Sequence, residues 1–231
     1  MAIFPEKDVS RPLNGFPVAL SAIIGINVAV FIVELALGDS FIDRYSLKPY
    51  EISHGHQLDT LLTSMFMHAS LVHIGGNMLF LWVFGDEIEV NYLGAGRFVV
   101  FYLLCGFAAE ALQIGVEPNS TVPNLGASGA IAGVMGGFML VFPHDKIQTF
   151  IFPLFQTRIT AAVFIGIWFL IQLVSGLGSI TTINNGGVAY FAHVGGFVAG
   201  FLLIKPFGIG AEEHAAYLPE QQVDANLKNR L

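Results

Sequence analysis

One serine in this chain stands among small residues at the start of an apolar segment, in the stretch NLGASGAIAGVMGG that covers residues 124–137. A lone serine in such a segment is ordinarily inert, because its hydroxyl bonds back to a helix carbonyl four residues earlier. Ser128, however, is flanked by Gly126 and Gly129, and His193 occurs at a comparable depth in the last apolar segment. A serine nucleophile with a histidine base is the minimal arrangement for peptide-bond hydrolysis.

A second pair of polar residues is spaced to act with this serine. His73 and Asn77 are four residues apart and so lie on one face of a helix. Their side chains could donate to a developing oxyanion together with the backbone N–H of Ser128. The alternative is a buried histidine–asparagine pair that only joins helices. His68 is expected to support the site rather than act in it.

Two further arrangements of these groups are weaker. A metal site built from the histidines at positions 68, 73 and 193 lacks a carboxylate or cysteine in register, so no metal ligand is predicted. A catalytic triad would need an acid, and Glu110 is the only distant candidate. A structural or interfacial role suits Glu110 better. The sequence therefore favours a dyad of Ser128 and His193.

Small residues supply a way to bring the two segments together. His193, Gly196 and Gly200 share one helix face, at positions i, i+3 and i+7. Glycine also recurs every four residues in the serine segment, at positions 129, 133 and 137. Such spacing lets membrane helices approach closely. Close approach is also what a serine with a one-carbon arm needs to reach an imidazole.

The composition places these residues in a membrane protein. The chain has 231 residues, of which 54% are hydrophobic and 12% charged, whereas soluble domains carry about 25% charged residues. The net charge of −7 and the lack of a basic patch exclude a nucleic-acid partner. A single cysteine, Cys105, allows neither an internal disulfide nor a cysteine-based metal site. The first 16 residues do not resemble a cleaved signal peptide.

Six apolar stretches predict the architecture. They cover residues 18–37, 71–84, 98–115, 126–142, 160–174 and 188–204, and an interfacial piece is possible at 61–67. Runs of this length must be helices, because lipid requires every backbone polar group to be paired within the segment. We expect an all-α membrane protein with a six-transmembrane-helix bundle in one domain, residues 1–210. A polar, mobile cytoplasmic tail is expected over 211–231.

The basic residues predict the orientation of the bundle. With a cytoplasmic N-terminus, the inner side holds the basic residues at 7, 11, 97, 146, 158, 205, 228 and 230, and the outer side holds only Arg44 and Lys48. This bias places both termini in the cytoplasm. The segments that carry His73, Ser128 and His193 then all run inward, so these residues share a depth near the outer leaflet.

The combined motifs resemble the rhomboid family of intramembrane serine proteases. The resemblance rests on GASGA around Ser128, AHVGGFVAG around His193 and HIGGN at 73–77, and it extends over about 61–207. It implies cleavage of single-pass membrane proteins in or near their transmembrane segments, without metal, ATP or cofactor. Carried over by position, Ser128 is the nucleophile and His193 the general base. His73, Asn77 and the Ser128 amide form the oxyanion hole, and Gly126 belongs to the GxSG turn.

Two positions depart from the rhomboid pattern. Many members carry an aromatic residue four positions after the serine, where it packs on the catalytic imidazole, and this chain has Ala132 there. Another side chain must then hold His193. Many members also have a Trp-Arg pair in the first outer loop, where this chain has Asp59 and Thr60. That difference concerns the anchoring of the loop and not the reaction.

Other functions remain open on the sequence. An inactive rhomboid-like protein that captures membrane-protein clients is the main alternative, although such proteins usually lose the serine or the histidine. A small-solute transporter is disfavoured, because inverted repeats and Gly/Pro-interrupted helix pairs are not seen. We expect lipid and single-pass membrane proteins as partners, and a prokaryotic plasma membrane as the location, with the site open to the outside. The sequence defines neither the substrate nor the oligomeric state.

Overall fold

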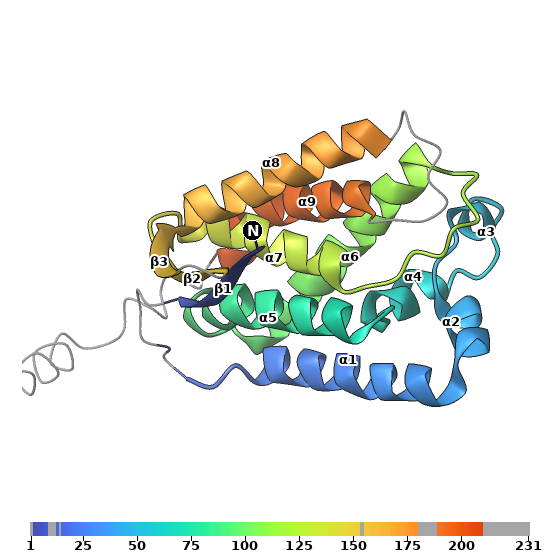
Figure 1. Cartoon of the computed structure of the whole chain (residues 1–231), viewed down its shortest axis with the longest axis horizontal. Coiled ribbons are helices and arrows are strands. Elements are labelled where there is room, and N and C mark those ends of the chain that lie inside the picture. The colour runs from blue at the N-terminus through green and yellow to red at the C-terminus, as the bar shows by residue number, and fades with distance from the viewer. Residues whose placement is uncertain (1, 9–12, 14, 153–154, 180–188, 210–231) are drawn as a thin grey trace, which may run out of the picture.

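The structure, a computed structural model, describes residues 2–8, 13, 15–152, 155–179 and 189–209. Most of them are helical, and the longer helices run alongside one another (Figure 1). The long helices are α1 (Val18–Leu37), α5 (Leu71–Glu87), α6 (Ala95–Val116), α7 (Ser128–Val141), α8 (Ala161–Ser179) and α9 (Tyr190–Gly208). The short ones are α2 (Asp39–Tyr45), α3 (Pro49–Ser53), α4 (Thr60–Thr63), the 3-10 turn η1 (Ser64–Phe66) and the π-helix η2 (Ile88–Leu93).

Each of the six predicted stretches overlaps one of the long helices, although α5, α6, α8 and α9 extend beyond the predicted bounds. Within the described residues, four helices are long and apolar enough to cross a membrane, namely α1, α6, α9 and the part of α8 at Ala161–Gly178. Thr60–Phe66 and Leu71–Leu93 would form a fifth span if they act together, although the chain bends by 91° between them. α7 is shorter than a span. The predicted total of six spans therefore stays a prediction, as does the division into a domain at 1–210 and a tail. The tail at 211–231 lies outside the described residues.

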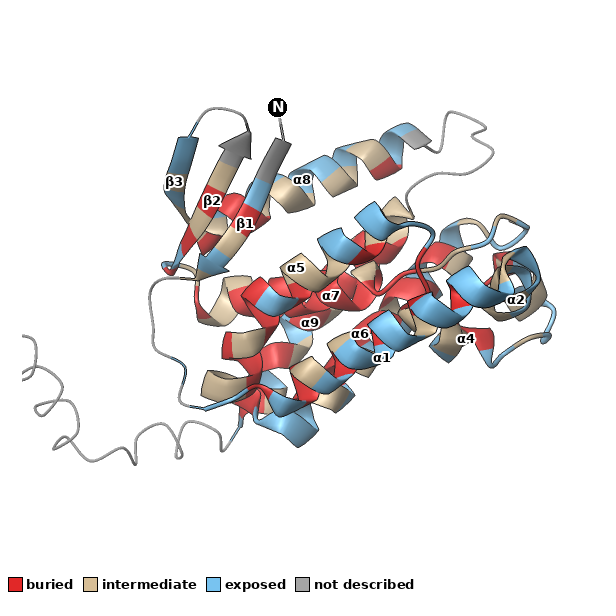
Figure 2. Ribbon diagram, turned by 60° about the horizontal axis from the view of Figure 1, so that its bottom comes forward, coloured by how far each residue is buried: buried red, intermediate tan, exposed pale blue. Residues whose placement is uncertain are grey.

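The short helix α7 forms the centre of the bundle. Every residue from Gly129 to Phe138 is buried, and α5, α6, α8 and α9 all pack against it, so the buried residues concentrate there (Figure 2). Its 14 residues span about 21 Å, which is less than the roughly 30 Å of a bilayer core.

A seam of glycines joins α7 to α9. A Cβ atom added at Gly196 would overlap the carbonyl oxygen of Gly129, and one added at Gly200 would overlap that of Gly133. The backbones thus touch directly at two successive levels. Larger residues would hold two such helices apart, which is why small residues favour close packing in membranes.

A buried carboxylate fixes α1 to the end of the second segment. Glu89 accepts hydrogen bonds from the backbone N–H groups of Ala19 at 2.9 Å and Leu20 at 2.6 Å. The first N–H groups of a helix lack partners within it and favour a negative charge. The predicted second stretch, 71–84, ends too early, because α5 continues to Glu87 and η2 follows to place Glu89 under α1.

A small sheet corrects the expectation of an all-α protein. Strands β1 (Ala2–Asp8), β2 (Lys146–Phe152) and β3 (Phe155–Thr160) form an antiparallel sheet in the order β1-β2-β3. The middle strand alternates as strands do, with Ile147 and Thr149 buried and Gln148 partly exposed. Besides β3, the middle strand β2 pairs with β1, which lies near the N-terminus. In this pairing Phe4 is opposite Phe150. Local patterns carry no sign of such a distant pairing.

Candidate active site

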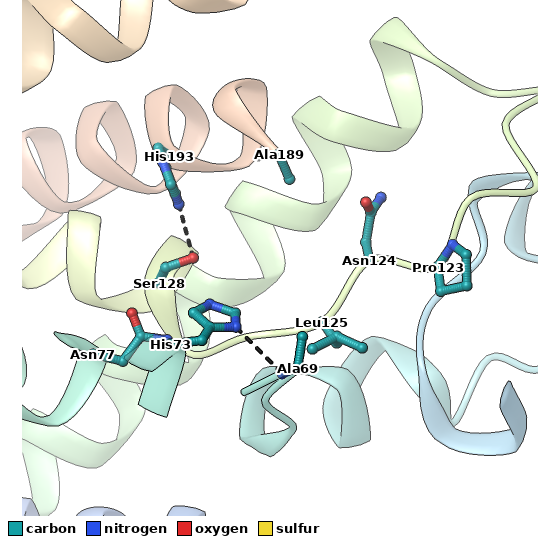
Figure 3. A pocket seen from close by; sticks show the side chains of 9 residues that line it. All are labelled: Ala69, His73, Asn77, Pro123, Asn124, Leu125, Ser128, Ala189 and His193. Carbon is teal, nitrogen blue, oxygen red and sulfur yellow. Dashed lines mark hydrogen bonds between the residues drawn. The ribbon is translucent and has the colours of Figure 1, made fainter. Parts of the chain in front are cut away.

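The serine and the histidine singled out in the sequence form a hydrogen bond. Ser128 Oγ lies 2.8 Å from His193 Nε2 (Figure 3). Ser128 is the first residue of α7, and His193 lies in the first turn of α9. The glycine seam explains how so short a side chain reaches the ring, since the two helix backbones are in contact just below the pair.

The other ring nitrogen of His193 is held by α8. His193 Nδ1 lies 2.8 Å from Gln172 Oε1. An amide oxygen can only accept, so Nδ1 carries the proton and Nε2 presents its lone pair to the Ser128 hydroxyl. Trp168 lies one turn earlier on α8. The centroids of its ring and of the imidazole are 5.7 Å apart, and the two ring planes meet at 38°.

Sequence reasoning missed both of these α8 residues. Gln172 is an amide within an apolar run, and a polar side chain inside a membrane helix is costly unless it has a partner. This need for a partner was the feature of the sequence that could have identified Gln172. Glu110, the acid considered in the sequence, is buried on α6, but the Nδ1 partner of the histidine is Gln172.

The start of α5 brings His73 against the turn before the serine. Ser70 caps α5 by accepting from His73 N–H at 3.1 Å, and the N–H of Ala69 donates to His73 Nδ1 at 3.4 Å (Figure 3). A neutral His73 therefore carries its proton on Nε2. A Cβ at Gly126 would lie 3.1 Å from that nitrogen, and Gly126 has a φ of 135°. Glycine is needed there for both reasons.

Asn77 is backed by a second layer of polar groups. Its Nδ2 lies 2.9 Å from His68 Nε2. The backbone N–H of His68 donates to both carboxylate oxygens of Glu34 at 3.1 Å, and Glu34 is buried on α1. The rings of His68 and His73 meet edge to face with centroids 5.1 Å apart. His68 thus lies behind Asn77, in contact with both predicted oxyanion donors.

These groups share one cavity of ≈ 460 Å³. Its lining consists of Ala69, His73, Asn77, Pro123, Asn124, Leu125, Ser128, Ala189 and His193. The close-up shows Ser128, His73 and Asn77 gathered on one side, with His193 reaching down from α9 (Figure 3). The structure therefore brings together all four of the predicted polar side chains. A serine hydroxyl, an imidazole and two potential hydrogen-bond donors face the same space.

A family comparison agrees with this geometry. The Rhomboid domain model matches residues 55–208. The chain belongs to the Rhomboid domain family. Its relatives include Rhomboid protein 1, mitochondrial, of Saccharomyces cerevisiae, which is 34% identical over 189 residues, or 78% of this chain and 51% of that protein. Rhomboid protease GluP of Bacillus subtilis is 30% identical over 149 residues, 64% of this chain and 26% of that protein.

A third relative bears on the location. RHOMBOID-like protein 6, mitochondrial, of Arabidopsis thaliana is 28% identical over 153 residues, 66% of this chain and 45% of that protein. The rhomboid chain described here spans about half the length of these relatives or less. Two of the three are named as mitochondrial proteins. The expected prokaryotic plasma membrane is therefore corrected, because these relatives point to a mitochondrial membrane instead.

The first outer loop of this rhomboid lacks the Trp-Arg pair, and other contacts hold the loop in place. Arg44 forms an ion pair with Asp59 at 2.9 Å. Leu47 and Asn124 exchange two backbone hydrogen bonds, of 2.9 and 2.7 Å. Gly126 N–H donates to the carbonyl of Ser64 at 2.9 Å. The loop is thus bound to the segment that leads into the serine, without a Trp-Arg pair.

Proposed function

We propose that this rhomboid domain is an intramembrane serine endopeptidase that uses Ser128 as nucleophile and His193 as general base. The observation that carries the proposal is the 2.8 Å contact between Ser128 Oγ and His193 Nε2 inside a cavity that His73 and Asn77 also line. A nucleophile, a base within hydrogen-bond reach and donors at the same space are the parts that acyl transfer requires.

The reaction follows from the position of each proton. Ser128 Oγ attacks the carbonyl carbon while His193 Nε2 takes its proton and then gives it to the leaving amine. The oxyanion meets the His73 Nε2–H and the backbone N–H of Ser128, which is unpaired within α7 because it is the first residue. Asn77 carries two amide hydrogens, so one can bond His68 while the other faces the oxyanion. Water then releases the acyl group by the same steps in reverse order.

We propose single-pass membrane proteins as substrates, cut in or near their transmembrane segments. A cavity of ≈ 460 Å³ accommodates a few residues of extended chain and not a helix of about 10–12 Å diameter. The substrate helix must therefore unwind at the cleaved bond, which also frees the carbonyl that is attacked. Lipid surrounds the apolar outer faces of α1 and α8.

The topology is part of the same proposal. We place α1, α5, α6, α7, α8 and α9 as six spans with both termini on the more basic side. Of the basic residues, those at 7, 146 and 158 belong to the strands of the sheet, 97 is in the first turn of α6 and 205 in the last turn of α9. Arg44 is in α2 and Lys48 directly precedes α3. The sheet and the α2–α3 region lie at opposite ends of the bundle (Figure 1). α5, α7 and α9 all begin toward the α2–α3 end, so the site is nearer to that side.

A reconstituted cleavage assay tests the proposal. The full chain in liposomes is given a panel of single-pass substrates, and the products are mapped by mass spectrometry. Ser128→Ala and His193→Ala are expected to abolish cleavage, while wild type cleaves in the presence of EDTA and without ATP. Equal cleavage by wild type and Ser128→Ala would refute the assignment. The competing role, an inactive protein that captures membrane clients, predicts client binding with no Ser128-dependent labelling by a fluorophosphonate.

A further inference from the structure

We infer that Gln172 and Trp168 of α8 are positioning residues for the general base, so that the dyad depends on a third helix. This inference rests on the proposed function and extends it. Neither residue lines the cavity itself, and both act on the reaction through His193, which does.

Gln172 selects the reactive form of the imidazole. A neutral histidine carries one proton on either nitrogen, and only the form protonated on Nδ1 can accept from Ser128 at Nε2. The Oε1 atom of Gln172 lies 2.8 Å from Nδ1 and favours that form. His193 is only 8% exposed, so water does not readily replace this partner. Removing the acceptor would let the ring turn or change tautomer.

Trp168 supplies the contact that Ala132 cannot. Ala132 lies on α7 with a single methyl group, and it is fully buried. The indole of Trp168 instead approaches the imidazole from α8, with centroids 5.7 Å apart. The aromatic ring beside His193 therefore comes from α8 rather than α7, one turn before Gln172.

α8 also packs against α9 through residues on either side of Gln172. The rings of Phe169 and Phe197 stack with centroids 4.1 Å apart, and a Cβ at Gly176 would lie 3.2 Å from Tyr190 Cβ. In the apolar span Ala161–Gly178 of α8, 28% of the residues are buried, the same share as in α1. The side chains that orient the base are thus among the contacts between α8 and the start of α9. A displacement of α8 would loosen His193 directly.

The test compares matched substitutions at two positions. Gln172→Met keeps the length of the side chain but removes the acceptor, whereas Gln172→Glu keeps an acceptor oxygen at the same reach. Trp168→Ala and Trp168→Phe form the second pair. Ile171→Ala is the control, because Ile171 is the exposed neighbour of Gln172 on α8. Each variant is measured in liposomes for kcat, KM and the rate constant of fluorophosphonate labelling.

Gln172→Met is expected to lower both kcat and the labelling rate constant about fivefold to tenfold, the worth of one hydrogen bond, with KM within about twofold of wild type. Gln172→Glu and Trp168→Phe should recover most of the rate, and Ile171→Ala should match wild type. Wild-type rates in Gln172→Met, or an equal loss in Ile171→Ala, would overturn the inference. Ser128→Ala separates the two claims: if it abolishes labelling while Gln172→Met is unaffected, only the positioning role fails.

Discussion

Replacing Gly200 by alanine tests whether the glycine seam holds the dyad together. The added Cβ would lie 2.6 Å from the Cα atom of Gly133, whereas carbon atoms pack at about 3.5–4.0 Å. α7 and α9 must therefore move apart by roughly 1 Å at this level. Ser128 and His193 lie on these same two helices at 2.8 Å, so the separation carries their contact beyond the usual hydrogen-bond limit of about 3.2 Å.

The expected loss is large because the contact belongs to the reacting groups. A misplacement of about 1 Å can cost about 10²-fold in rate. We expect kcat/KM of Gly200→Ala to fall by about that factor, with most of the fall in kcat. The assay is cleavage of one reconstituted substrate under single-turnover and steady-state conditions. Thermal unfolding in detergent, measured in parallel, reports any loss of folded protein.

The matched control is the same substitution where the structure leaves room. Gly166 on α8 has no heavy atom within 4 Å of an added Cβ, and alanine is the better helix former. Gly166→Ala should cleave at the wild-type rate and unfold at the same temperature or higher. The reasoning is refuted if Gly200→Ala cleaves within about threefold of wild type, because the seam would then not set the distance between the reacting groups.

Three further substitutions separate stability from catalysis. Glu89→Ala should lower the unfolding temperature, because it leaves two backbone donors at the start of α1 unpaired at about 1–3 kcal/mol each; an unchanged melting curve would contradict this role. Glu34→Ala removes the acceptor for His68 N–H and should lower kcat more than it raises KM, whereas an effect on KM alone would argue against it. Gly126→Ala should lower kcat at least tenfold or so, since its φ of 135° and its approach to His73 both exclude a side chain; normal turnover would show that this turn can relax.

The predictable parts of the molecule were those with a local signal. Apolar runs of membrane length predicted the long helices. The four-residue spacing of His73 and Asn77 predicted that they share one helix face, and both line the cavity. The glycine faces were predicted as well, because small residues at helical spacing have one dominant use in membranes. Even there one position differed: Gly136, rather than Gly137, lies against the α9 backbone at Phe197.

What escaped prediction depends on contacts between distant residues. The sheet pairs β1 with β2 across most of the sequence, and the pattern within a strand does not identify such a distant partner. Gln172 lies 21 residues before His193, and no spacing rule relates the two. Glu34 reaches His68 across 34 residues. Each of these polar groups inside the bundle signalled that a partner must exist, but the sequence could not say which one.

In the proposed mechanism the reacting groups are divided among several helices. The nucleophile and one backbone oxyanion donor would come from α7, the base from α9, its orientation from α8, and the side-chain oxyanion donors from α5, with α1 bracing the loop before α5 through Glu34. Small shifts between helices therefore change reacting distances before they unfold the bundle. Variants at the helix contacts should accordingly lose kcat at temperatures where the protein is still folded, and this difference should be largest at the α8 residues that contact the base.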